Sequence, residues 1–251
     1  MTAAVTNDAF LGGKVMAIQP AKGFRSGIDA VLLAAAVPAR SGQTVLELGC
    51  GVGVAALCVN ARVGGLRMTG VEVQASYAEL ARKNAATNDA DLTIVNADLR
   101  ALPSALRQRQ FDHVMTNPPY FQREAGTAAT DVGRDIALSG DTPMADWIDI
   151  AAKRLAPKGY LTLIQHMTRL PEILSLVHQR LGSIVVRPIL ARPDRDPELF
   201  LLQSRHSGRA PFRLAQPLLV HEGQNHSGDQ ESYTQQLQGI LRGGASFDMA
   251  D

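Results

Sequence analysis

Short β-rich runs alternate with helical stretches along most of this 251-residue chain. Such alternation is typical of an α/β fold, in which helices cover both faces of a mostly parallel sheet. Only residues 190–198 join the last two runs. This connection is too short for a crossover helix, so we expect the seventh strand to run antiparallel. The expected strands are Thr44–Leu48, Arg67–Val73, Leu92–Asn96, Phe111–Thr116, Tyr160–Gln165, Ile184–Ile189 and Leu199–Ser204. The expected helices are Ile28–Val37, Val54–Val63, Ser76–Thr87, Met144–Leu155, Pro171–Leu181 and Tyr233–Leu241.

No internal repeat or long linker divides the chain. We therefore expect one domain over residues 1–242, with an N-terminal extension (1–22) and a flexible tail (243–251). The connection 122–140 is rich in Gly, Ala, Thr and Asp, and connections of this length are usually lids, binding loops or disordered segments. A second flexible segment is expected at 225–231.

The composition is that of an ordinary soluble protein, with 45% hydrophobic and 20% charged residues. No apolar run reaches the ~20 residues that a membrane span needs, and Met1–Phe10 has no signal-peptide pattern. Cys50 and Cys58 are too few for a disulfide framework and lack zinc-ligand spacing. We expect no metal site, reduced thiols and a cytoplasmic location.

Charge is unevenly distributed although the net charge is only +1. Residues 180–213 carry seven arginines against three acids, and residues 221–251 carry five acids against Arg242. A basic ribbon is compatible with phosphate contacts. Such ribbons are more often ordinary solvated surface, so the ribbon weighs little by itself.

A rigid elbow follows the expected strand Phe111–Thr116, where the sequence reads Asn117-Pro118-Pro119-Tyr120. Neither proline can donate a ladder hydrogen bond, so the chain must leave the sheet here. The elbow brings together an amide, a backbone carbonyl and an aromatic ring at the carboxyl end of a strand, where open α/β sheets bind ligands. This set suits a planar amino group, although Asn-Pro is also a common surface turn.

A glycine-rich turn follows the first expected strand, with Glu47 at its start and glycines at 49, 51 and 53. The dinucleotide fingerprint G-x-G-x-x-G would need glycine at 54, where this chain has Val54. A pyrophosphate site is therefore not indicated. An acidic residue before the turn instead suits a ligand with a cationic end, such as an amino acid ammonium.

Two more acids end the next expected strands. Glu72 can accept hydrogen bonds from both hydroxyls of a ribose, and Asp98 can accept from an adenine amino group. Taken singly, each of these acids could equally be a solvent-exposed turn residue. Glu47, Glu72, Asp98 and Asn117 nevertheless end four successive strands, and this order favours a shared binding edge.

The chain resembles class I S-adenosylmethionine-dependent methyltransferases, which implies a Rossmann-like seven-stranded fold. Residues 47–53 resemble the cofactor turn and residues 117–120 the amino-methylating signature. Residues 23–34 resemble the tRNA(1)(Val) adenine-37 N6-methyltransferase group, and Ser26-x-x-Asp29 reads as a capping box at a helix start. The resemblance implies catalytic roles for Asn117, Pro118, Pro119 and Tyr120. It implies cofactor contacts for Phe24, Arg25, Glu47, Gly49, Gly51, Gly53, Glu72, Val73, Asp98 and Asn117.

The resemblance implies methylation of an exocyclic amino group, with adenine N6 in tRNA as the first expectation. RNA is then the partner, a membrane is not, and a monomer is favoured. Protein glutamine N5 and rRNA guanine N2 are the alternative acceptors, since each is a planar amino group. The chain has no helical domain of ~70 residues before the turn, as the glutamine enzymes have. A non-catalytic module that binds the cofactor or RNA is the more distant alternative.

Overall fold

The computed structural model describes residues 4–120, 142–223 and 232–250. The expected binding loop 122–140 and the segment 225–231 lie outside the described residues. The described chain is built around a sheet with the strand order β10-β8-β9-β7-β6-β3-β4-β5, and β11 also pairs with β8. Five neighbouring strands run parallel, namely β3 (Thr44–Leu48), β4 (Arg67–Glu72), β5 (Leu92–Asn96), β6 (Phe111–Thr116) and β7 (Leu155–His166). The expected α/β class is confirmed.

The expected antiparallel strand is β9 (Leu199–Arg205). It lies between β7 and β8 (Gly182–Leu190) and runs antiparallel to both. All seven expected strands are present. Two strands of two residues each, β10 (Arg213–Leu214) and β11 (Leu218–Leu219), also pair with β8, so the sheet in the described residues has nine strands. Segments this short leave no alternating pattern to read.

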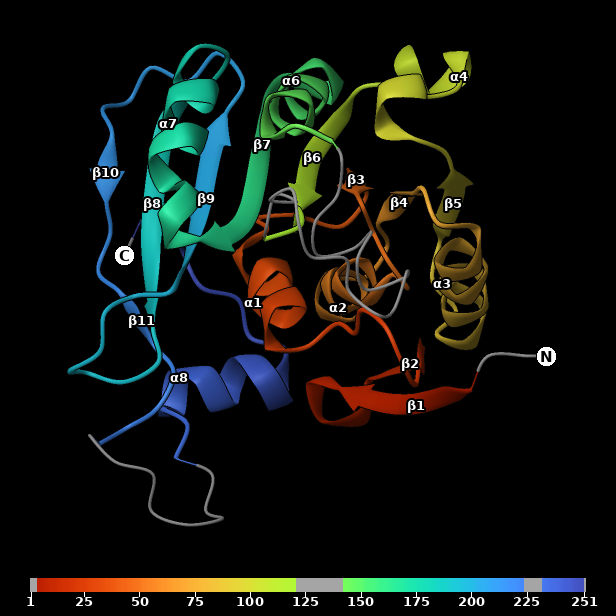
Figure 1. The fold of residues 1–251 in the computed structure, drawn as a ribbon, viewed down its shortest axis with the longest axis horizontal. Coiled ribbons are helices and arrows are strands. Elements are labelled where there is room, and N and C mark those ends of the chain that lie inside the picture. Colours follow the sequence, from red (N-terminus) through yellow and green to blue (C-terminus); the bar gives the residue numbers. More distant parts are fainter. Residues whose placement is uncertain (1–3, 121–141, 224–231, 251) are drawn as a thin grey trace, which may run out of the picture.

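Helices cover both faces of the sheet, as expected (Figure 1). One core cluster contains α1 (Ile28–Ala36), α2 (Val54–Val63) and α3 (Ala75–Thr87). The other contains α4 (Ser104–Arg107), α6 (Met144–Arg154) and α7 (Leu170–His178). Short 3-10 turns lie at η1 (Leu11–Gly13), η2 (Leu99–Ala101) and η3 (Met167–Arg169). None of the helices within the described ranges combines the length and apolar character needed to cross a membrane.

Helix α1 is buried on nearly all sides, with seven of its nine residues inside the core. Its second cover comes from the C-terminal part of the chain, where α8 (Gln235–Gln238) runs into the π-helical turn η4 (Gly239–Gly243). Residues 243–250, which we expected to form a flexible tail, also pack here. Met249 is only 2% exposed, and the Phe247 amide donates to the Ala35 carbonyl at 3.4 Å. The boundaries of the single domain stay a prediction.

The N-terminal extension is a β-hairpin, which the sequence analysis did not predict. Strands β1 (Val5–Phe10) and β2 (Val15–Pro20) pair antiparallel to each other. The other edge of β2 is bound by two asparagines four residues apart, Asn84 on α3 and Asn88 at the C-cap of that helix. Asn84 accepts from the Ile18 amide at 2.8 Å and donates to its carbonyl at 3.0 Å, and Asn88 makes the same pair with Met16 at 3.0 and 2.7 Å. Side chains of a helix thus replace a neighbouring strand.

The expected capping box at the start of α1 is wrong. Gly27 is the N-cap residue and makes no side-chain cap, so Ser26 lies one position too early. The Ser26 amide instead donates to the Gln19 side chain at 2.8 Å. Asp29 is drawn away from the helix end because its carboxylate accepts a hydrogen bond from the Tyr120 hydroxyl.

We predict that Asn84→Ala destabilises the protein by roughly 2–4 kcal/mol. The fully buried Asn84 also donates to the Val52 carbonyl at 3.0 Å. Its loss leaves the buried Val52 carbonyl and two half-buried groups of Ile18 short of a partner, and a buried group in this state costs about 1–3 kcal/mol before the site relaxes. Urea unfolding measures the effect, and faster hydrogen exchange at the Ile18 amide locates it. The exposed Asn7→Ala in β1 is the control, and equal stability of the two variants would contradict the prediction.

Candidate active site

A cavity of about 330 Å³ opens where β3, β4, β5 and β6 end. Parallel strands bring their carboxyl ends to one edge of a sheet, which is why residues far apart in the sequence meet here. The residues expected at a site that line this cavity are Phe24, Gly49, Gly51, Glu72, Val73, Asp98, Asn117, Pro118, Pro119 and Tyr120. Arg25, Glu47 and Gly53 lie outside the described cavity wall.

The glycine turn is shaped by close contact with α6. Gly49 has a φ of +66°, and a Cβ atom at this position would lie 2.6 Å from Cη2 of Trp147. No other residue fits without moving the indole. Trp147, the only tryptophan of the chain, is 7% exposed and forms part of the cavity wall. The sequence analysis missed it, because a lone tryptophan in an amphipathic helix is usually a core residue.

Glu72 joins the two turns that frame the cavity. One carboxylate oxygen accepts from the Gly51 amide at 2.9 Å and the other from the Gln74 amide at 2.8 Å. Burial raises the pKa of Glu72, and the backbone hydrogen bonds to Gln74, Gly51 and Val73 oppose that shift. The carboxylate is therefore fixed in place at the wall, with lone pairs left for a ligand hydroxyl.

Asp98 makes more hydrogen bonds within the protein than its place at a strand end suggested. The Arg100 guanidinium donates to both carboxylate oxygens, at 2.7 Å from Nη2 and 3.1–3.2 Å from Nε, and the Arg100 amide adds a bond at 2.8 Å. The hydrogen bond from the Arg100 side chain holds the pKa of Asp98 below its usual value. Asp98 stays charged at the cavity wall, but an adenine amino group would share it with Arg100.

The elbow after β6 leaves one acceptor open. Within the described residues, the side-chain oxygen of Asn117 is buried and has no hydrogen-bond partner, which is uncommon because an unpaired buried acceptor costs free energy. Tyr120 donates from its hydroxyl to Asp29 in the first turn of α1. Burial, followed by the nearby charge of Asp29, raises the pKa of Tyr120, while a hydrogen bond from the Asn117 side chain opposes the shift. The tyrosine is neutral and held in position.

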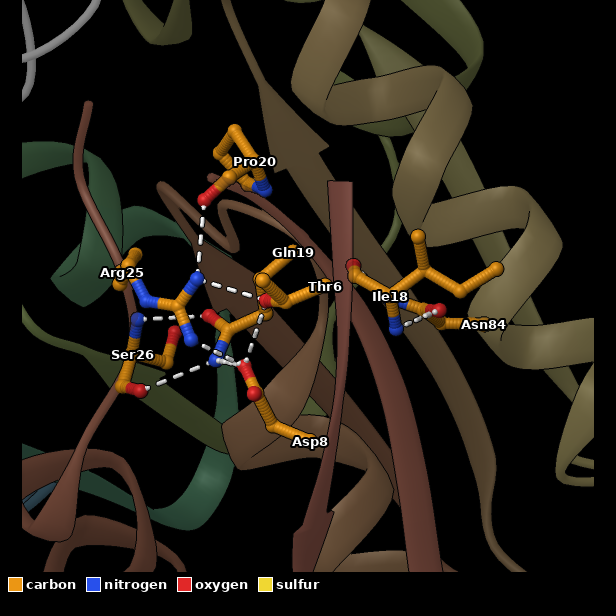
Figure 2. Close-up of polar contacts among 8 residues, drawn as sticks. All are labelled: Thr6, Asp8, Ile18, Gln19, Pro20, Arg25, Ser26 and Asn84. Carbon is orange, nitrogen blue, oxygen red and sulfur yellow. Dashed lines mark hydrogen bonds and ion pairs between the residues drawn. The ribbon is translucent and has the colours of Figure 1, made fainter. Parts of the chain in front are cut away.

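Arg25 binds the N-terminal hairpin and does not reach the cavity wall. Its guanidinium donates to Thr6 Oγ1 at 2.6 Å, to the Pro20 carbonyl at 3.1 Å and to Asp8 at 2.6 Å, as Figure 2 shows. Its neighbour Phe24 does line the cavity. The Tyr77 hydroxyl accepts from the Phe24 amide at 2.9 Å and donates to the Phe24 carbonyl at 3.2 Å, a contact that no sequence pattern indicated.

Glu47 lies beneath the glycine turn. It is 4% exposed, and its carboxylate accepts from the Ala56 amide at 3.1 Å in the first turn of α2. Burial raises the pKa of Glu47 to about 8. The Ala56 bond opposes the shift, and the charge of Glu72 adds to it. Glu47 caps the N-terminal end of α2 through this hydrogen bond, and its raised pKa leaves it mostly protonated at neutral pH.

Most of the arginines in the basic ribbon 180–213 bind within the molecule. Arg180 pairs with Asp149 at 3.2 Å, Arg192 donates to the Glu222 and Gly223 carbonyls, and Arg205 donates to the Lys158 carbonyl. Arg187 is buried and lies over the Phe247 ring. Arg195 and Arg209 are exposed. The charge of this ribbon is therefore mainly structural.

We predict that Glu47→Gln removes a pH dependence of stability. Because folding raises the pKa of Glu47 from 4.5 to about 8, the folded protein binds a proton that the unfolded chain releases between these values. Its stability therefore falls as pH rises through this window. Glutamine keeps an acceptor for the Ala56 amide and does not titrate. We expect the melting temperature of Glu47→Gln, relative to that of wild type, to rise between pH 5 and pH 8.

Thermal unfolding in a pH series measures this difference, at about 2–4 °C per kcal/mol for a chain of this size. Glu79→Gln is the control, because Glu79 lies on the exposed face of α3. A constant difference between Glu47→Gln and wild type across the series would contradict the assignment.

Comparison with solved structures places the fold among methyltransferases. A predicted O-methyltransferase of Agrobacterium tumefaciens superimposes with a TM-score of 0.71 at 26% sequence identity, covering 88% of this chain and 98% of that one. The 16S rRNA N2 G1207 methyltransferase of T. Thermophilus, solved with AdoMet and guanosine, has a TM-score of 0.56. At 19% identity, with 81% of this chain and 50% of that one covered, it supports the fold alone.

Sequence comparison agrees with this result. Two relatives carry the name tRNA1(Val) (adenine(37)-N6)-methyltransferase. The protein from Porphyromonas gingivalis is 32% identical over 211 residues, covering 78% of this chain and 81% of the relative. One from Shewanella baltica is 35% identical over 179 residues, covering 67% and 72%. The family model "Methyltransferase small domain" matches residues 25–184, and the chain belongs to this family.

Proposed function

We propose that this protein transfers a methyl group from S-adenosylmethionine to the N6 amino group of an adenine in tRNA. The observation that carries the proposal is the open acceptor of Asn117, buried at the cavity wall beside Pro118. The relatives named as tRNA adenine-N6 methyltransferases support the choice of acceptor. We place this activity in the cytoplasm, in one domain and in a monomer.

The cavity has the groups that S-adenosylmethionine needs. When bound, the cofactor supplies an electrophilic methyl group on its sulfonium. Glu72 can accept from the ribose hydroxyls, and Asp98 and Arg100 form a charged pair at the same wall. Phe24, Val73 and Leu99 offer apolar surface for the adenine ring. Glu47 lies beneath the glycine turn and acts through its hydrogen bond to α2.

The elbow supplies the acceptor half of the site. An exocyclic amino nitrogen is a weak nucleophile because its lone pair is delocalised into the ring. Asn117 Oδ1 and the Pro118 carbonyl can each accept one N–H, which favours a pyramidal nitrogen with its lone pair directed at the methyl group. Fixed dipoles of this kind stabilise the charge that develops in the transition state. The nitrogen forms a new bond to the methyl carbon as the bond between that carbon and the sulfonium sulfur breaks, and one of its two hydrogens leaves as a proton to water.

Tyr120 is placed to stack on the base, which contributes about 1–3 kcal/mol for an aromatic–base contact. Its hydroxyl bond to Asp29 holds the ring at the cavity wall. A base in a tRNA loop is accessible for such stacking, whereas a base inside a stem must first be unstacked. The geometry therefore suits a single-stranded acceptor.

Mass spectrometry of nucleosides tests the acceptor directly. The protein is incubated with total tRNA, with rRNA and with a protein extract, each with methyl-labelled S-adenosylmethionine. Label in N6-methyladenosine from tRNA supports the proposal. Label in N2-methylguanosine or in protein glutamine would replace the adenine assignment while keeping the chemistry.

We predict that Asn117→Ala abolishes methyl transfer, with kcat reduced about 10²–10³-fold, the effect of removing one hydrogen-bonding group from such a site. The change removes a buried unpaired acceptor together with the hydrogen bond from the Asn117 side chain to Tyr120, so the melting temperature should change little. Cofactor affinity, followed through the fluorescence of Trp147, should stay within a few-fold of wild type. Turnover at the wild-type rate would refute the role of Asn117.

We predict the converse for Glu72→Ala. Because this carboxylate bridges the Gly51 and Gln74 amides at the cavity wall, its loss should weaken cofactor binding about 10–100-fold, as expected for charged hydrogen bonds worth ~1.5–3 kcal/mol. Isothermal titration calorimetry measures the affinity. Normal affinity would remove the ribose assignment.

A further inference from the structure

Two proline carbonyls lie at the point where β6 leaves the sheet. The last pair in register between β6 and β7 is Thr116 with Leu163, so Pro118 lies level with Gln165. A proline offers a carbonyl to the next strand but no N–H. The elbow therefore cannot continue the ladder, and its carbonyls need donors from elsewhere.

Gln165 supplies those donors. Its side-chain Nε2 donates to the Pro118 carbonyl at 3.1 Å and to the Pro119 carbonyl at 3.3 Å. Its Oε1 accepts from the His166 amide at 2.8 Å. The backbone bond fixes which way the amide faces, because a flipped amide would set oxygen against both carbonyls and nitrogen against an N–H. Gln165 is fully buried and does not line the cavity.

We propose that Gln165 is a positioning residue for methyl transfer, which sets the direction of the Pro118 carbonyl toward the acceptor amino group. This inference rests on the proposed function. A carbonyl oxygen has two lone pairs, so one can accept from Gln165 while the other accepts from the substrate. Thr116 and Gln165 then hold the elbow from two sides, since the Thr116 hydroxyl donates to the Leu48 carbonyl at 2.9 Å on β3.

Glutamine is the side chain that this position requires. Glutamate has the same shape and can still accept from the His166 amide, but when ionised it sets a charged oxygen against two carbonyls. Methionine has similar length and no donor. Both substitutions therefore remove the hydrogen bonds to the two proline carbonyls. Glutamate adds electrostatic repulsion, and methionine does not.

The test uses the full-length variants Gln165→Glu and Gln165→Met, with Gln203→Glu and Gln203→Met as matched controls. Gln203 is a strand glutamine of β9 that donates to the Ala36 carbonyl at 3.1 Å, away from the cavity. We expect both Gln165 variants to lose roughly 30–100-fold in kcat, the order caused by small misplacement of a reacting group. KM for S-adenosylmethionine and the affinity read from Trp147 should change less than about threefold.

A second readout does not depend on turnover. Hydrogen exchange of the peptide covering 111–120 should quicken in the Gln165 variants and not in the Gln203 variants, because the elbow loses its attachment to β7. If kcat falls only in proportion to melting temperature, or KM rises as much as kcat falls, Gln165 is merely structural. Unchanged exchange over 111–120 also overturns the inference.

The proposed function is judged separately, on the wild-type protein. If wild type methylates no adenine in tRNA but another nucleoside or protein takes the label, the same four variants are assayed on that acceptor. The acceptor assignment then fails while the positioning role is still decided by kcat and exchange. Normal kcat in Gln165→Met on the true acceptor refutes the role outright.

Discussion

The two prolines that end β6 are the constraint on which the site depends. They interrupt a central strand because they have carbonyls and no N–H groups, so the chain turns out of the sheet at its carboxyl edge. Three contacts from other elements then fix the elbow: the Leu48 carbonyl on β3 that accepts from Thr116, the Gln165 amide from β7 and the Asp29 carboxylate that accepts from Tyr120. The open acceptor of Asn117 stays open because these contacts hold the backbone around it.

The opposite wall of the cavity is held in a similar way. Glu72 accepts from the amides of two separate turns, and Glu47 accepts from the start of α2. Arg25 binds the hairpin, and Tyr77 binds the backbone of Phe24. These contacts fix the segment that places Phe24 at the cavity wall. Residues that bind one another thus keep the residues that line the cavity in place, and the candidate site needs both groups.

Much of the fold could be predicted from the sequence, because alternating strands and helices produce periodic patterns of apolar and polar residues. The ends of successive strands indicated Glu72, Asp98 and Asn117, and all three line one cavity. The hairpin was missed because β2 gets its second partner from Asn84 and Asn88, 66 and 72 residues away in sequence. The capping box at Ser26 and Asp29 failed because Gly27 is the N-cap residue, and Asp29 binds Tyr120 instead. Residues 243–250 pack because α1, buried at seven of its nine residues, needs a second cover.

Local sequence patterns were enough to predict the order along the chain of strands β3 to β9, the turn at Gly49 to Gly53 and the break at Pro118 and Pro119. These features follow from backbone chemistry within a few residues. Which polar side chains line the cavity, and which bind other parts of the protein, follows from the tertiary structure. Arg25 and Glu47 lie outside the cavity wall and bind other parts of the protein, whereas Trp147 and Tyr77 line the cavity. Gln165 gained its contact with the elbow from the register of β6 and β7. The reason is physical: a side chain's role depends on which hydrogen-bond partners its neighbours leave unpaired, and those neighbours come from distant parts of the chain.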